Sequence, residues 1–147
     1  MDKLKIGIIG CGGIANSKHL PALKAHRDKC EVVAFCDIIE ERAVKTREKF
    51  GTEDARVYTD YHELLKEREI DVVHVLTPNV SHCPITVDAF RAGKHVMCEK
   101  PMAASSSDAK KMLEAWKASG KKFTIGYQNR FRPEVQNLKA ACEAGEL

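Results

Sequence analysis

The stretch KIGIIGCGGIANSKHLPAL, residues 5–23, decides the fold of this chain. An apolar run leads into three glycines within four positions, at Gly10, Gly12 and Gly13. Glycine adds no side chain to a core and costs backbone entropy on folding. A chain that gives up side chains where a strand turns into a helix indicates that a ligand must approach its backbone.

Short apolar runs recur along the rest of the chain. They are rich in β-branched residues and nearly continuous, a pattern typical of parallel strands that are covered on both faces. The run at 56–59 is the weakest of them. The expected strands are residues 4–9, 31–36, 56–59, 71–76, 94–98 and 122–127.

Amphipathic segments with start and stop signals fill the gaps between these runs. A capping residue is expected to begin three of the helices (Asp60 with Glu63, Asn79, and Ser105 with Asp108), and a glycine is expected to end three of them (Gly51, Gly93 and Gly120). Pro21 and Pro84 must each lie in a first turn or mark a kink. Besides the helix that the glycines open, the expected helices are residues 39–50, 60–68, 80–92 and 108–119.

Strands and helices therefore alternate from one end of the chain to the other. Such alternation indicates βαβ units with right-handed crossovers and a parallel sheet. Six strands match the doubly wound Rossmann fold, an α/β class of three αβα layers with strand order 3-2-1-4-5-6. The chain has 147 residues, the length of one ordinary domain, so residues 1–147 are expected to form one dinucleotide-binding domain.

Composition excludes several other classes of protein. The net charge is only +3 and charges of both signs are interspersed, whereas a nucleic-acid interface is normally a clustered basic face. We find no stretch of membrane-spanning length and no signal-peptide pattern, so no membrane partner and a cytoplasmic location are expected. The cysteines form no CxxC pair and have no zinc-finger spacing, which predicts reduced thiols and no bound metal. They are Cys11, Cys30, Cys36, Cys83, Cys98 and Cys142.

The glycines read G-x-G-x-x-A, a pattern that is informative because it follows a strand and opens a helix. Gly10 permits the tight turn, Gly12 lets the backbone approach a pyrophosphate, and Ala15 allows close packing of helix on strand. The diphosphate would lie at the positive end of the helix. The predicted cofactor-binding residues of this loop are Gly10, Cys11, Gly12, Gly13, Ile14 and Ala15.

Asp37 ends the second apolar run, at about the sequence distance expected of the carboxylate that binds the adenosine ribose. A carboxylate accepts from ribose hydroxyls and repels a 2′-phosphate, and no Arg or Ser follows it immediately. NAD is therefore favoured over NADP. Two alternatives stay open at this point: Asp37 as the N-cap of the next helix, and an S-adenosylmethionine-dependent methyltransferase, a class that shares both features.

Three later motifs follow strands at the carboxyl edge of the sheet, where ligands bind in this fold. TPNVSH places Thr77, Pro78 and Asn79 there, with His82 near a helix start as either a packing residue or a catalytic one. CEKPM holds Lys100 extended, because a residue before proline is disfavoured in a helix. GYQNRF adds Gln128, Asn129 and Arg130 to the same edge.

Taken together, GIIGCGGIA, HLPAL, TPNVSH, AGKHVMCEKPMA and GYQNRF resemble the N-terminal half of the glucose-fructose oxidoreductase / inositol dehydrogenase (Gfo/Idh/MocA) family. EKP is the most specific piece, and methyltransferases lack it. The resemblance implies NAD(P)-dependent oxidation or reduction of sugars, cyclitols or related polyols. It implies that Gly10, Gly12, Asp37 and the loop 77–79 bind cofactor, and that Glu99 and Lys100 lie near the nicotinamide.

The resemblance also implies a second α/β domain that builds the substrate cleft, and the chain stops at Leu147, about where that domain would begin. Hydride transfer requires an acid/base, and Lys100 is the predicted one, with His82 as helper. The further predicted cofactor contacts are His82, Glu99, Lys100 and Gln128. The chain alone is expected to bind NAD, to self-associate and not to turn over substrate. A non-enzymatic NAD-binding module is the alternative function.

Overall fold

A computed structural model describes residues 3–146, and it contains the expected parallel sheet. The sheet has six strands in the order β3-β2-β1-β4-β5-β6, and every neighbouring pair is parallel. The prediction of a doubly wound α/β fold is confirmed. The strands are β1 Leu4–Ile9, β2 Cys30–Cys36, β3 Arg56–Tyr58, β4 Val72–Val75, β5 His95–Cys98 and β6 Phe123–Ile125.

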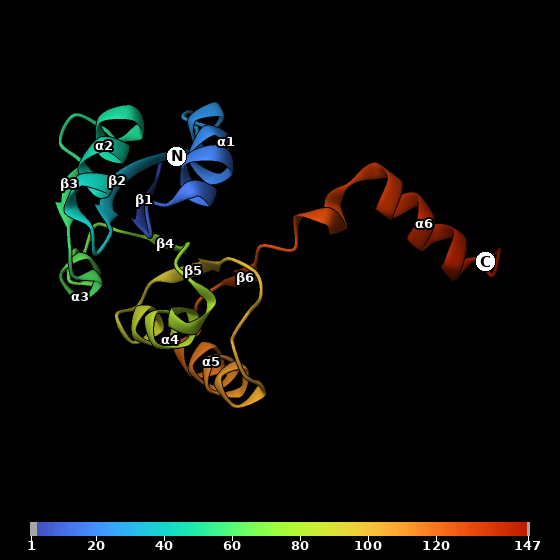
Figure 1. Ribbon diagram of the computed structural model, residues 1–147. Coiled ribbons are helices and arrows are strands. Elements are labelled where there is room, and N and C mark those ends of the chain that lie inside the picture. The colour runs from blue at the N-terminus through green and yellow to red at the C-terminus, as the bar shows by residue number, and fades with distance from the viewer. Residues whose placement is uncertain (1–2, 147) are drawn as a thin grey trace.

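Helices cover both faces of this sheet, while the last helix extends away from it (Figure 1). Next to the first face lie α1 (Leu20–Ala25) and α2 (Glu40–Phe50), with the π-helical turn η1 (Ala15–His19) before α1. Over the other face lie α3 (Tyr61–Leu65), α4 (His82–Arg91) and α5 (Ser106–Ser119), with the 3₁₀ turn η2 (Asn79–Ser81) before α4. The 3₁₀ turn η3 (Gln128–Phe131) leads to α6 (Pro133–Glu143).

Two apolar cores form because neighbouring strand residues point to opposite faces. Ile8 and Phe35 enter the core beneath α1 and α2, where Leu20 is also buried. Val73 and Val75 enter the core beneath α3, α4 and α5. Gly7 belongs to this second face, and a Cβ there would lie only 3.0 Å from the Leu64 side chain. The sheet is therefore anchored on both sides, with its carboxyl edge left for a site.

The helix ends agree only in part with their predicted signals. Ser105 caps α5 by accepting from the Asp108 N–H, and Gly120 ends it with φ +64°. The prediction for Asn79 is wrong: it begins η2, and α4 starts at His82 without a side-chain cap. A short 3₁₀ turn comes first because the chain must bend from the β4 edge before the helix can start.

Gly51 ends α2 as expected, but for a different reason from the left-handed cap. Its backbone is extended, with φ −72°. A Cβ at this position would lie 2.8 Å from the Arg47 carbonyl oxygen and 3.0 Å from the Phe35 ring. Glycine is therefore required here by close packing, not by backbone conformation.

The two prolines meet the two predicted alternatives differently. Pro21 is the second residue of α1, but the helical run begins at Gly13, so Pro21 lies inside it, two residues after a π-helical turn whose wider spacing accommodates a residue that lacks an N–H. Pro84 is the third residue of α4. At the start of α3, Asp60 accepts from the His62 N–H, whereas Glu63 pairs with Lys66 instead of closing the expected capping box.

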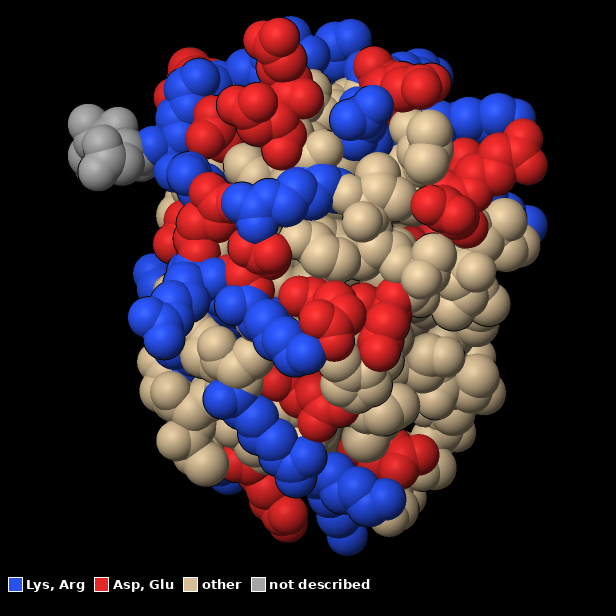
Figure 2. All heavy atoms as spheres, turned by 90° about the vertical axis from the view of Figure 1, so that its left-hand side faces the viewer, with Lys and Arg blue, Asp and Glu red and all other residues tan. Residues whose placement is uncertain are grey.

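The surface on the β3 side carries acidic and basic side chains side by side (Figure 2). Glu69 pairs at 2.7 Å with Arg56 on β3 and also with Lys5 at the start of β1. Among residues 3–146, no helix is both long and apolar enough to cross a bilayer.

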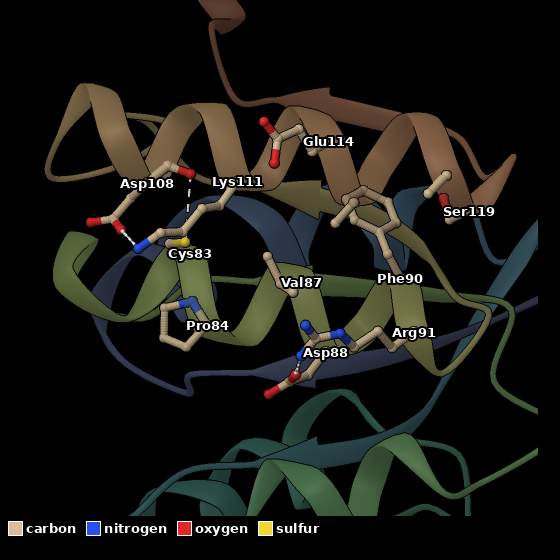
Figure 3. Close-up of a pocket in the computed structure, with 12 residues that line it drawn as sticks. Cys83, Pro84, Val87, Asp88, Phe90, Arg91, Asp108, Lys111, Glu114 and Ser119 are labelled. Carbon is tan, nitrogen blue, oxygen red and sulfur yellow. Dashed lines mark hydrogen bonds and ion pairs between the residues drawn. The ribbon is translucent and has the colours of Figure 1, made fainter.

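A groove of about 950 Å³ separates the outer faces of α4 and α5. In Figure 3 two charged pairs lie along their own helices, Asp108 with Lys111 and Asp88 with Arg91. Glu114 also lines the groove, so acidic side chains outnumber basic ones there.

Candidate functional site

A cleft of about 710 Å³ opens at the carboxyl edge of β1, β2 and β4, where the strand order reverses. Small-molecule sites commonly measure about 300–1,000 Å³. In a doubly wound sheet this is the position at which ligands bind. The lining residues include Gly10, Gly12, Gly13, Ile14, Asp37, Ile38, Arg42, Thr59, Asp60, Tyr61, Thr77, Pro78 and Ser81.

Gly10 makes the turn out of β1 that forms the floor of this cleft. Its φ is +97°, a conformation that residues with a side chain rarely adopt. A Cβ there would lie 2.8 Å from the backbone carbonyl of Leu76 in the neighbouring strand connection. The Gly10 N–H also donates to the Cys36 carbonyl at 2.8 Å. Glycine is thus required twice, by conformation and by space.

Gly12 and Gly13 face open space, in contrast to Gly10. A Cβ at either position would meet nothing within 4 Å. The helix that leads into η1 begins at Gly13, so its first N–H groups lack helical partners and lie beside the cleft. The Asn16 amide fixes the loop by donating to the carbonyls of Cys11 and Gly12. The loop is thus a preformed cradle for an anion.

Asp37 connects this cradle to the end of β2. Its Oδ2 accepts from the Cys11 N–H and its Oδ1 accepts from the Ile39 N–H, both at 2.9 Å. The alternative role as the N-cap of α2 is wrong, because α2 starts at Glu40 with Ile39 as its cap residue. Asp37 is 8 % exposed, so a nearly buried carboxylate lies at the edge of the cleft.

Two buried thiols lie beside this carboxylate. Burial, together with the charge of Asp37, raises the pKa of both Cys11 and Cys36 to about 12. The Cys11 thiol also contacts the Cys36 carbonyl at 3.6 Å. Both thiols therefore stay protonated at neutral pH and act as small apolar groups.

The loop after β4 forms the wall that faces the glycine loop. Thr77 and Pro78 line the cleft, and the buried Thr77 hydroxyl finds no hydrogen-bond partner among residues 3–146. Asn79 is exposed and does not line it. His82 is 1 % exposed, and its ring contacts the Thr77 and Pro101 carbonyls. A ring held in this way contacts two loops and not the cleft, so its burial does not favour the predicted catalytic role.

The predicted residues beyond β5 and β6 lie further along the same edge, outside the cleft lining. Glu99 is nearly buried, and its carboxylate contacts the ring of His19 at 2.7 Å. Lys100 is exposed and precedes a cis peptide bond to Pro101. Gln128 is exposed at the start of η3. The fold thus brings the strand ends to one edge without joining all the predicted side chains in one pocket.

Sequence reasoning missed several residues that the structure brings to this edge. Arg42, Thr59, Asp60 and Tyr61 line the cleft near Asp37 although they lie on other elements. His19 and His74 stack edge to face at 5.6 Å between ring centroids, next to Glu99. Burial and the neighbouring His19 lower the pKa of His74 to about 3. Among these residues Asp60 had a signal in the sequence, but as a helix cap and not as part of a site.

The site offers a cradle for a dinucleotide and nothing arranged for a metal. The open space over Gly12 and Gly13, the partnerless Thr77 hydroxyl and the Asp37 carboxylate fit a phosphate chain and a ribose. Among residues 3–146, no three His, Cys, Asp or Glu side chains are grouped to hold a metal ion. The fold and this cleft define a dinucleotide-binding Rossmann domain.

Comparison with known proteins agrees with this class. Residues 4–127 match the model of the oxidoreductase family with an NAD-binding Rossmann fold, Gfo/Idh/MocA. The chain belongs to this family, as the sequence motifs predicted, and the methyltransferase alternative is unsupported.

Individual relatives and solved structures extend the match over nearly the whole chain. Inositol 2-dehydrogenase of Salmonella typhimurium is 37% identical over 145 residues, which cover 98% of this chain and 43% of that protein. The WlbA dehydrogenase of Bordetella pertussis, solved with NADH and UDP-GlcNAcA, superposes with a TM-score of 0.91 at 30% identity, over 98% of this chain and 43% of that one.

A second solved structure carries the other nicotinamide cofactor. KijD10, a 3-ketoreductase from Actinomadura kijaniata solved with NADP and TDP-benzene, has a TM-score of 0.88 at 28% identity, over 98% of this chain and 43% of that one. The chain thus spans less than half the length of the proteins that it matches here.

Proposed function

We propose that this chain is the cofactor-binding part of a nicotinamide-dependent dehydrogenase that acts on a sugar, cyclitol or related polyol. The observation that carries the proposal is the cleft at the strand-order reversal, with the open glycine loop at one side and Asp37 at the other. An inositol 2-dehydrogenase among the relatives and a dehydrogenase solved with UDP-GlcNAcA support the substrate class.

Each part of the edge has a distinct task in this proposal. The glycine loop and the following helix bind the diphosphate, and Asp37 accepts from ribose hydroxyls through the lone pairs that Cys11 and Ile39 leave free. The bound cofactor supplies the hydride chemistry. Lys100, exposed beyond β5, contacts the substrate oxygen and holds or relays its proton.

We further propose that NAD is preferred over NADP. The nearly buried charge of Asp37 repels a 2′-phosphate, whereas the Arg42 guanidinium in the same cleft attracts one. Asp37 is the stronger influence because two backbone N–H groups fix its carboxylate at the edge of the cleft. The family neighbours include complexes with either cofactor, so this balance is decided by residues of the individual chain.

Calorimetric titration of the 147-residue chain with NADH and NADPH tests the proposal. We expect binding of NADH, weaker binding of NADPH, and a smaller difference between them in Asp37→Ser. Arg42→Ala is the matched variant on the same cleft wall, and it is expected to weaken NADPH more than NADH. Failure of wild type to bind either dinucleotide would contradict the proposal.

Turnover and assembly are separate parts of the proposal. With saturating NAD and a panel of inositols and sugars, the chain alone is expected to give no steady increase in absorbance of reduced nicotinamide, because nothing here positions a substrate.

Self-association is the second part. Apolar surface is exposed on η3 and α6 at Phe131, Val135 and Leu138, which supports self-association. Sedimentation velocity measures the assembly, and a monomer at all concentrations would contradict it. A cytoplasmic location remains a proposal that accords with six free thiols.

A further inference from the structure

Lys100 lies between two residues that are each held by a histidine from a different helix. Glu99 precedes it and contacts His19, and Pro101 follows it and contacts His82. The Lys100 side chain itself is exposed, so these contacts are what fixes its backbone.

The contact on the Glu99 side is short and shielded. His19 Nε2 lies 2.7 Å from Glu99 Oε1, and both side chains are 11% exposed. The second oxygen, Oε2, accepts from the Lys100 N–H at 3.0 Å. Gly126 closes the third side, since a Cβ there would lie 3.0 Å from Oε1. The carboxylate thus ties the Lys100 backbone to η1, which directly follows the glycine loop.

The contact on the Pro101 side uses a fully buried ring. His82 Nδ1 lies 2.8 Å from the Pro101 carbonyl oxygen, and its Nε2 lies 2.9 Å from the Thr77 carbonyl oxygen. A carbonyl oxygen can only accept a hydrogen bond. Each contact is therefore a hydrogen bond only when the ring nitrogen in that contact carries a proton. The ring therefore ties the segment after Lys100 to the loop after β4, which lines the cleft.

The ring of His74 supports the first contact. It packs edge to face against His19, with an angle of 86° between the rings, and this restricts how the His19 ring can turn. Burial and the nearby His19 lower the pKa of His74 to about 3. His74 therefore stays neutral beside the His19–Glu99 contact.

We propose that His19 and His82 are positioning residues that couple Lys100 to the two cofactor-binding loops, so that dinucleotide binding fixes where the lysine amine lies. The inference rests on the proposed function, in which Lys100 works beside the bound dinucleotide. It assigns His19 a role, and it replaces a direct catalytic role of His82 with one exerted through Lys100.

Trace acetylation of lysines in the 147-residue chain, quantified by peptide mass spectrometry, tests the coupling. The rate at Lys100 is divided by the rate at the exposed Lys110, with and without saturating NADH. In wild type we expect NADH to slow acetylation of Lys100. In His19→Ala and His82→Ala we expect this protection to be lost, while the Kd for NADH rises by less than about threefold.

Amide variants separate positioning from a loss of bulk. Gln presents an N–H near the place of Nε2 and Asn presents one near the place of Nδ1. At position 19 the Nε2 contact matters, so His19→Gln restores protection and His19→Asn does not. At position 82 the Pro101 contact is made by Nδ1, so His82→Asn restores protection and His82→Gln does not. The exposed His26→Gln is the control and keeps protection.

This crossed pattern distinguishes the coupling from the proposed function. NADH binding without protection of Lys100 in wild type would overturn the placement of Lys100 and the coupling with it. Protection that persists in all variants, or that falls equally in Gln and Asn, would overturn the coupling alone. If His82 variants melt early, the two amide variants of the less buried His19 decide the outcome.

Discussion

The two ends of the ligand-binding edge are built from different chemistry. At the β1–β2 end, backbone N–H groups, glycines and the carboxylate of Asp37 shape the cleft. At the β4–β6 end, imidazole rings of His19 and His82 hold the segment around Lys100. The first end is stiff because the backbone itself is constrained, whereas the second depends on contacts between side chains, with the desolvated ring of His74 packed against His19. Substitutions at the first end should therefore act mainly on folding and affinity, whereas His74 at the second end makes the stability depend on pH.

The largest effect is expected for Gly10→Ala. The fold holds φ of residue 10 at +97°, and a methyl group makes this conformation unfavourable. The methyl group would also lie 2.8 Å from the Leu76 backbone. We expect a loss of about 4 kcal/mol in the free energy of unfolding, from left-handed strain and overpacking together. Urea unfolding followed by circular dichroism measures it. A loss as small as that of an ordinary surface substitution would show that the turn is not constrained as described.

Asp37→Asn should come next, at the same end of the cleft. An amide keeps the volume but sets an NH₂ group against the N–H of either Cys11 or Ile39. We expect a loss of about 2–3 kcal/mol in the free energy of unfolding, because a buried N–H is left without an acceptor. The same urea titration applies, and exposed Asp54→Asn is the control. Equal stability of the two variants would contradict the carboxylate bridge.

A pH dependence is expected at the opposite end, from His74. Its pKa is lowered from 6.5 to about 3 in the folded state, so the unfolded chain binds the proton more tightly. The contribution to stability is complete above pH 6.5 and is lost as the pH falls toward 3. At pH 5 the loss in the free energy of unfolding amounts to about 2 kcal/mol.

Unfolding free energies of wild type and His74→Leu, measured from pH 8 to pH 5, isolate this contribution. The variant should lose less stability on acidification, while exposed His26→Gln should follow wild type. Parallel curves for wild type and His74→Leu would mean that His74 is not desolvated in the folded protein.

The smallest effect on folding is expected for Gly12→Ala, only two residues from Gly10. A Cβ at Gly12 meets nothing within 4 Å, so the free energy of unfolding should change by under about 0.5 kcal/mol. The methyl group nevertheless occupies the space over the loop, and the Kd for NADH should rise about tenfold or more. Calorimetry and urea unfolding on one sample separate the two. A stable variant with unchanged affinity would remove Gly12 from the cofactor contact.

The sequence predicted the β1–β2 end well because its signals are local. Strand order followed from alternation, and the glycine loop and Asp37 followed from short spacings along the chain. The β4–β6 end was predicted less completely. The His19–Glu99 contact joins residues 80 positions apart, and no periodicity or motif encodes such a pair. Glu99 and Lys100 were placed at the edge, but their partners were visible only in the fold.

The helix ends show the same difference between local signals, which the sequence reveals, and contacts between distant elements, which it does not. Ser105 was predicted correctly as a cap because its partner, Asp108, is three residues away. Asn79 was not, because the direction in which the chain leaves β4 depends on the packing of a whole helix against the sheet. Gly51 was identified as a stop, yet its reason lies in the distant Phe35 ring. Local hydrogen bonds can be read from spacing, whereas steric limits set by another element cannot.

The ion pairs on β3 bear on aggregation. An outer strand offers unpaired N–H and C=O groups to any other strand that meets it. This one is only three residues long, and Arg56 on it is engaged by Glu67 and Glu69. A second chain would have to desolvate these charges before it extended the sheet, and this cost disfavours growth into fibrils from this side.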